Sequence, residues 1–120
     1  MQMPHVKFLD RNPSVATAIA AAFPAWDVGC DDIWSGVPAD IIVSPANVTG
    51  RMDGGIDQVY IDRFGWQLEA RLQRDIKTLY GGHLPIGQAH LITTYDDAIP
   101  LMICAPTMEW PPGYLGNTED

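Results

Sequence analysis

Basic residues are scarce in this chain of 120 residues. Seven lysines and arginines stand against fifteen aspartates and glutamates, which gives a formal net charge of −8. Proteins that bind nucleic acids gain affinity largely from Lys and Arg side chains that neutralise phosphates. The charge therefore argues against DNA or RNA as the main partner. It does not exclude a small diphosphate ligand, because backbone dipoles act on such a ligand at contact range.

Several other patterns are absent. No apolar run is long enough to span a bilayer, so no membrane partner is expected. Cys30 and Cys104 form no C-x-x-C motif and lie among strand-like residues, so we expect two buried, reduced thiols. The histidines at 5, 83 and 90 lack metal-ligand spacing, so no metal site is predicted. Walker A and Gly-x-Gly-x-x-Gly patterns are missing, and no cofactor is expected. The start of the chain lacks a signal-peptide pattern, which favours the cytoplasm.

Strand-like and helix-like segments alternate along the chain, which predicts one domain of the α/β class. The run of apolar residues at 39–44 is continuous, as in a strand that is buried on both faces. Asn12 is expected to cap the first helix, and Gly81 to end the last one. We expect strands over 6–9, 26–30, 39–44, 89–94 and 100–104, and helices over 13–23, 56–63 and 66–80.

The most informative segment follows the third predicted strand. Residues 45–53 form a loop that ends in Gly54-Gly55, after which a helix begins. Backbone N–H groups at such a loop and helix start can bind phosphate without any lysine. Asn47 and Asp57 flank the glycines and are ten positions apart. The alternatives are ordinary: Asn47 bonding its own backbone, Asp57 as a first-turn charge, and the glycines as a tight turn.

This segment resembles the macro domain, an α/β module that binds ADP-ribose. The matching residues are Ile41–Asn47 followed by Gly54-Gly55-Ile56-Asp57. Upstream, Asp31-Asp32-Ile33 is similar to the Gly-Asp-Ile of the family. Downstream, Leu84–Ala89 and Ile99–Met108 are similar to its later turn and central strand. The resemblance implies a three-layer α/β/α fold with a mixed sheet.

The resemblance also implies roles for individual residues. Asp32 would accept a hydrogen bond from adenine; the alternative is that Asp31 and Asp32 form a turn or a helix cap. Asn47, whose amide can donate and accept, would lie beside the distal ribose, and Asp57 would help to orient or activate a water. The implied catalytic pair is Asn47 and Asp57, and the implied ADP-ribose contacts are Asp32, Ile33, Ala46, Asn47, Gly54, Gly55 and Ile56.

The chain departs from the family in three respects. It resembles only about the first two thirds of a macro domain, with a macro-like domain over 1–108 and an irregular tail over 109–120. Asp53 places a negative charge near the expected phosphate, and Ser44-Pro45 stands where many members have Asn-Ala. The missing last third would leave a sheet edge and an apolar face uncovered. Either a partner chain covers them, or another copy of this chain does, or the sequence is a fragment. Three hypotheses remain: an ADP-ribosyl hydrolase, a module that only binds ADP-ribose, and a structural or assembly protein without the ligand.

Overall fold

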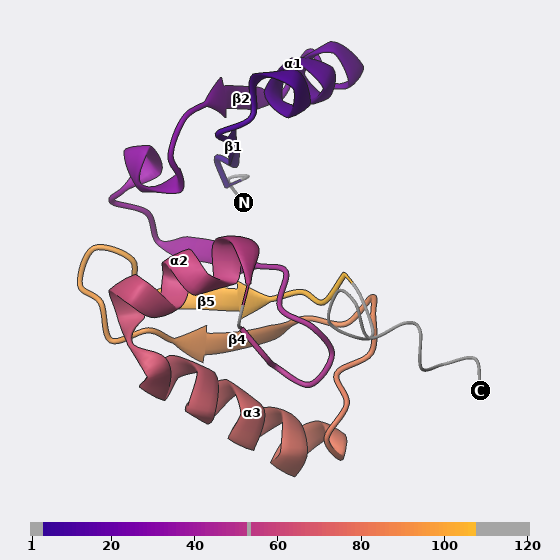
Figure 1. The fold of residues 1–120 in the computed structure, drawn as a ribbon, viewed down its shortest axis with the longest axis vertical. Helices are drawn as coiled ribbons and strands as arrows, with labels where there is room; N and C mark the ends of the chain where they lie inside the picture. The colour runs from indigo at the N-terminus through magenta and orange to yellow at the C-terminus, as the bar shows by residue number, and fades with distance from the viewer. Residues whose placement is uncertain (1–3, 53, 108–120) are drawn as a thin grey trace. The chain divides into compact units, whose positions relative to one another are not determined.

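The structure is a computed structural model that describes residues 4–52 and 54–107 (Figure 1). Asp53 and the predicted tail over 109–120 lie outside the described residues, so the expectations about them stay predictions. The chain divides into two compact units, Met1–Pro38 and Ala39–Asp120, and each is described by itself. None of the described helices is long and apolar enough to cross a membrane.

The first unit contains a strand–helix–strand motif. Its two strands pair in parallel, with Lys7 opposite Asp27 and Asp10 opposite Cys30. Asn12 caps the intervening helix as predicted, because its Oδ1 accepts a hydrogen bond of 2.9 Å from the backbone N–H of Ser14. The elements are β1 (Lys7–Asp10), α1 (Pro13–Ala22), β2 (Asp27–Cys30) and a short 3-10 helix, η1 (Ile33–Gly36).

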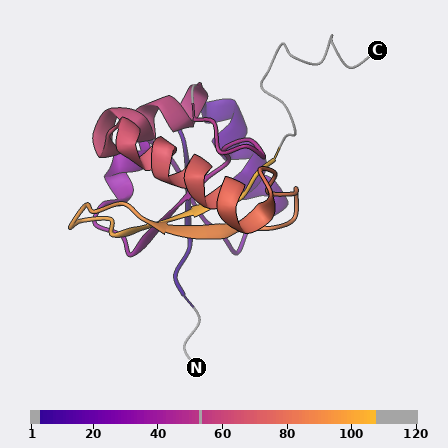
Figure 2. The same cartoon turned by 90° about the horizontal axis from the view of Figure 1, so that it is seen from below.

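The second unit contains a mixed sheet of three strands. Its strand order is β3-β5-β4; β3 runs parallel to β5, and β4 runs antiparallel to it. Figure 2 shows both helices of this unit on the same side of the sheet. The predicted α/β class with a mixed sheet is therefore confirmed. The elements are β3 (Ile41–Ser44), α2 (Gly55–Phe64), α3 (Trp66–Tyr80), β4 (His90–Thr93) and β5 (Leu101–Cys104).

One face of β3 is buried, whereas the other is open. Ile42 and Ser44 lie in the core, but Ile41 is exposed and 56% of Val43 is accessible to solvent. The prediction that this strand is buried on both faces is therefore wrong for the described structure. Side chains alternate between the faces of a strand, and α2 and α3 both pack against the same face. A continuous apolar run does not by itself show that both faces are covered.

Helix α3 buries a stripe of apolar side chains. Leu68, Leu72 and Ile76 are spaced at helical intervals and are fully or almost fully buried. The helix ends at Tyr80 and is followed by Gly81 in a left-handed conformation, as the sequence predicts. Leu79 continues the same helical spacing in the sequence, but 63% of it is exposed. It lies in the last turn, where the helix has passed the core.

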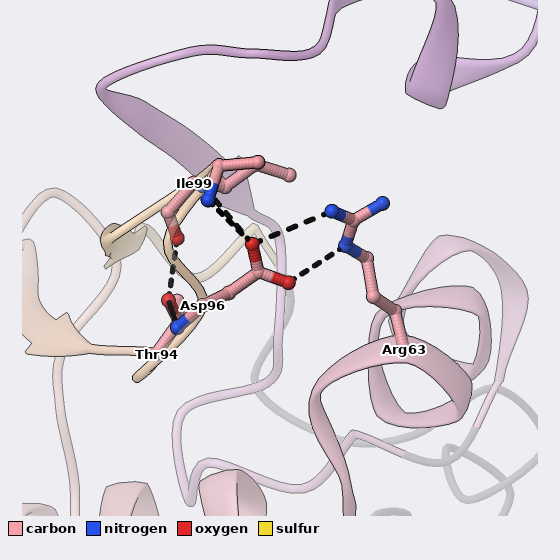
Figure 3. Close-up of polar contacts among 5 residues, drawn as sticks. Arg63, Thr94, Asp96 and Ile99 are labelled. Carbon is pink, nitrogen blue, oxygen red and sulfur yellow. Dashed lines mark hydrogen bonds and ion pairs between the residues drawn. The ribbon is translucent and has the colours of Figure 1, made fainter.

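A carboxylate joins the end of α2 to the loop between β4 and β5 (Figure 3). Asp96 accepts a hydrogen bond of 2.9 Å from Nε of Arg63, and its Oδ1 accepts from the backbone N–H groups of Ala98 and Ile99. Thr94 completes the loop by donating its hydroxyl to the Ile99 carbonyl. The Arg63 hydrogen bond is the main cause that lowers the pKa of Asp96, and it outweighs the opposing effect of burial.

The contribution of Leu72 to stability can be separated from its helix propensity. Leu72→Ala removes a fully buried side chain and should cost about 2–5 kcal/mol of unfolding free energy. Leu79→Ala makes the same chemical change on an exposed site of the same helix and should cost about 1 kcal/mol or less. Urea unfolding of both variants measures the difference. Equal losses would contradict the packing of α3 described above.

The Arg63–Asp96 contact should make stability depend on acid pH. Because the pKa of Asp96 is lowered on folding, its contribution is present above the unfolded value, about 4, and is lost as pH falls through the folded value. Asp96→Asn should therefore lower the unfolding temperature at pH 7 and change it little near pH 2. For a partly exposed pair the loss should be about 1 kcal/mol or less. Asp97→Asn, at the exposed neighbouring residue, is the control; an equal effect of the two variants would refute the assignment.

Candidate functional site

A buried hydrogen bond joins the end of β3 to the first turn of α2. The Ser44 hydroxyl donates to Oδ1 of Asp57 over 2.5 Å, and its oxygen accepts a 3.1 Å hydrogen bond from the N–H of Ala46. Ser44 is completely buried and Asp57 is 7% exposed. A carboxylate at such depth is stable only if it is hydrogen-bonded, so this contact fixes the distance between strand and helix.

Sequence reasoning did not assign Ser44 to the site. A serine at the end of a strand is too common to indicate a role, and its partner Asp57 is distant in sequence. The available signal was weak: the serine occupies a buried strand end, and the following helix carries an acidic residue in its first turn. Only the packing of α2 on the sheet brings the two side chains together.

Two ionisable groups near Asp57, the Cys104 thiol and the Tyr60 phenol, are neutral at ordinary pH. Burial raises the pKa of the Cys104 thiol to about 12, and the nearby Asp57 carboxylate adds to the rise. The pKa of the Tyr60 phenol is raised for the same two reasons, burial first. Tyr60 donates its hydroxyl to the carbonyl of Val43 on β3. The two cysteines are free thiols, as predicted. Cys104 is buried as expected, but Cys30 is exposed, so the prediction of a buried thiol is wrong there.

Asn47 closes the loop that follows β3. Its side-chain oxygen accepts three hydrogen bonds: from the N–H and the hydroxyl of Thr49, at 2.9 and 2.7 Å, and from the N–H of Arg51, at 3.2 Å. The ordinary alternative, an asparagine that bonds its own backbone, is therefore present. These three donors also fix the orientation of the amide. The NH₂ group is thus the part of the amide left to face a ligand, and the role of Asn47 beside a ribose stays a prediction.

The same loop is held against α3. Gly50 has a φ of +84°, and a Cβ placed on it would lie 2.9 Å from Cδ1 of Ile76 and 3.2 Å from Cγ of Leu72. Two residues later, the N–H of Met52 donates to the carboxylate of Glu69 over 2.7 Å. Glycine at 50 thus allows both the backbone conformation and the close approach to the helix.

The predicted phosphate loop is open to solvent at its glycines. A Cβ added to Gly54 or to Gly55 would meet no atom within 4 Å among the described residues. Gly54 is the N-cap of α2, and among the described residues no side chain caps this end of the helix. The first N–H groups of a helix have no partner within it, so they are available to an anion from outside. Asp57 lies in this first turn, as the sequence predicts.

Two of the predicted ligand contacts, Asp32 and Ile33, belong to the first unit. Asp32 caps the short helix η1, because its Oδ1 accepts from the N–H of Trp34 at 2.8 Å. Asp31 in turn accepts from the N–H of Asp32 at 2.7 Å. The cap that sequence analysis gave as the alternative is thus present, and the roles of Asp32 and Ile33 toward a ligand remain predictions.

The other predicted site residues belong to the second unit, in the loop after β3 or at the start of α2. They are Ala46, Asn47, Gly54, Gly55, Ile56 and Asp57. The side chain of Ala46 is buried, and its N–H is engaged by Ser44. The described residues contain no group of three or more His, Cys, Asp or Glu side chains placed to hold a metal ion. The arrangement suits recognition of an anion by backbone groups.

The fold has counterparts among solved structures. One is an Oceanobacillus iheyensis macrodomain with ADP; it shares 22% identity at a TM-score of 0.54 over 63% of this chain. Another is the macrodomain of Mycobacterium tuberculosis DarG, with 22% identity and a TM-score of 0.56 over 68% of this chain. This chain has a macrodomain fold. The matches cover 40% and 51% of those two chains, so this macrodomain spans about half their length or less. No family model and no curated protein matches it.

The close packing of this loop against α3 can be tested at Gly50. Gly50→Ala adds backbone strain and an overlap with Ile76 and Leu72, so it should cost about 2–4 kcal/mol of unfolding free energy. Gly81→Ala is the matched control, because Gly81 also has a positive φ, +71°, but open space around its Cβ. It should cost about 1 kcal/mol. Chemical denaturation measures both, and a loss at Gly81 as large as that at Gly50 would contradict the close approach to α3.

Proposed function

We propose that this macrodomain binds ADP-ribose, free or attached to a protein, through the backbone at the start of α2. The observation that carries the proposal is the open, uncapped Gly54-Gly55 turn beside a loop that is firmly braced. A diphosphate would accept hydrogen bonds from the N–H groups of Gly54, Gly55 and Ile56 and would face the positive end of the helix dipole. The solved Oceanobacillus macrodomain, which contains ADP, supports this proposal.

The remaining contacts follow from the chemistry of the site residues. Asn47 offers only its NH₂ group, so it would donate to an oxygen of the distal ribose. The resemblance implies that Asp32 selects adenine and that Ile33 also contacts the ligand. Because the net charge is −8, the affinity depends on these local dipoles rather than on long-range attraction.

Of the two candidates, a module that binds ADP-ribose without hydrolysing it fits the geometry better than a hydrolase. Asp57 is 7% exposed, and one of its oxygens accepts a hydrogen bond from the Ser44 hydroxyl, so this carboxylate is held in the interior. Hydrolysis of an ADP-ribosyl bond is the second candidate, favoured by the place of Asp57 in the first turn of α2, directly after the glycines. A hydrolase would need a carboxylate that positions a water at the ribose.

The open glycine turn gives a direct test of binding. Gly54 has an extended backbone (φ −166°), so a larger residue fits there without strain and projects into open space. Gly54→Val should place its side chain over the amides and weaken ADP-ribose binding about tenfold or more in calorimetric titration. Gly54→Ala loses the same glycine cap but adds less volume, so its affinity should lie between those of the valine variant and the wild type.

Two results would contradict the proposal. The first is a wild-type protein that gives no heat with millimolar ADP-ribose, which would leave a scaffold without the ligand. The second is a Gly54→Val variant that binds as tightly as the wild type. Release of ADP-ribose from a modified protein decides between the candidates: release by the wild type that is lost in Asp57→Ala would establish the hydrolase.

A further inference from the structure

Ser44 makes two hydrogen bonds, both to residues that follow it in the chain. Its hydroxyl donates a hydrogen bond to Asp57, in the first turn of α2, and accepts one from the N–H of Ala46, in the loop before α2. One buried hydroxyl therefore connects both ends of the segment that carries the proposed ligand contacts. Ser44 also lies opposite Cys104 on the neighbouring strand β5, so its backbone is fixed by the sheet.

The loop depends on this hydroxyl at its start. Ala46 is followed directly by Asn47, whose oxygen orders the N–H groups of Thr49 and Arg51. At the other end of the segment, Asp57 lies in the first turn of α2, directly after the Gly54-Gly55 turn. If the hydroxyl is removed, neither Ala46 nor Asp57 retains its link to β3 through this side chain. The NH₂ group of Asn47 and the amides of Gly54–Ile56 are then no longer held in place relative to each other by this side chain.

We propose that Ser44 is a positioning residue, which sets the Asn47 amide and the Gly54–Ile56 backbone in the arrangement that a nucleotide diphosphate requires. The proposal rests on the function proposed above. It assigns Ser44 no contact with the ligand, because Ser44 is completely buried. Its effect passes through Ala46 and Asp57.

Thr94 provides a matched control for the test. Like Ser44 it is a buried hydroxyl residue of the second unit with two hydrogen bonds, donating to the Ile99 carbonyl and accepting from the N–H of Asp96. It follows Thr93, which pairs with Leu101 at the start of β5, whereas Ser44 pairs with Cys104 at the end of β5. Thr94→Ala therefore removes a comparable bond at the opposite end of the sheet.

The first measurement needs no ligand. Amide hydrogen exchange of the full chain should be at least about tenfold faster in Ser44→Ala than in wild type at Ala46, Thr49 and Arg51, because local opening exposes these N–H groups. Exchange in the middle of α3 should be unchanged. Thr94→Ala should leave the three loop amides at wild-type rates. Unchanged loop amides in Ser44→Ala, or equal acceleration in both variants, would overturn the proposal.

The second measurement is ADP-ribose titration of the same proteins. Ser44→Ala should weaken binding about tenfold or more, while Thr94→Ala stays within about twofold of wild type at a similar fall in unfolding temperature. Asp57→Asn combined with Ser44→Ala should bind little more weakly than the weaker single variant, since both changes break one connection. Additive losses, or equal losses in Ser44→Ala and Thr94→Ala, would show a merely structural role. A wild type that does not bind ADP-ribose refutes the proposed function, and the exchange rates then decide on Ser44 alone.

Discussion

The hydrogen bond between Ser44 and Asp57 is the constraint on which the rest of the site depends. A carboxylate in the interior has to be paired with donors, and the donor here is a side chain whose backbone belongs to the sheet. The first turn of α2 is thereby tied to the end of β3. The loop between them cannot adjust freely at either end, and its internal bonds are satisfied by Asn47 and by contacts with α3.

The candidate anion site belongs to a chain that has few positive charges. The candidate site uses N–H groups at a helix start, which supply partial charges in a fixed direction and need no lysine or arginine. Such a site depends on backbone geometry more than on any single side chain. This explains why so much of the loop is braced: Gly50 is seated on α3, Met52 bonds Glu69, and Asn47 orders the residues after it.

Features of the fold that arise from neighbouring residues could be predicted from the sequence. Asn12 as a cap, the apolar spacing of α3 and Gly81 at its end each follow from the preferences of a few adjacent residues. The sequence also indicated the glycine loop at the start of α2. Exposure was harder to predict, because Val43 and Leu79 are apolar residues in regular positions whose accessibility depends on which elements pack nearby.

The details of the site were less predictable for the same reason. The partner of Asp57 and the direction of the Asn47 amide are set by hydrogen bonds that form only when loop, strand and helix are assembled. Sequence analysis gave both residues an ordinary alternative, and for Asn47 the structure contains it. The alternative and the proposed role are compatible, since the oxygen serves the loop while the NH₂ group remains for a ligand.

The most direct test of a backbone-built nucleotide site is an NMR titration of the ¹⁵N-labelled chain with ADP-ribose. The account predicts that the amide signals of Gly54, Gly55 and Ile56 and the side-chain NH₂ of Asn47 move most and saturate together. Saturating ADP-ribose that leaves these four signals unmoved in the folded protein, or that moves the signals of α3 alone, would contradict it.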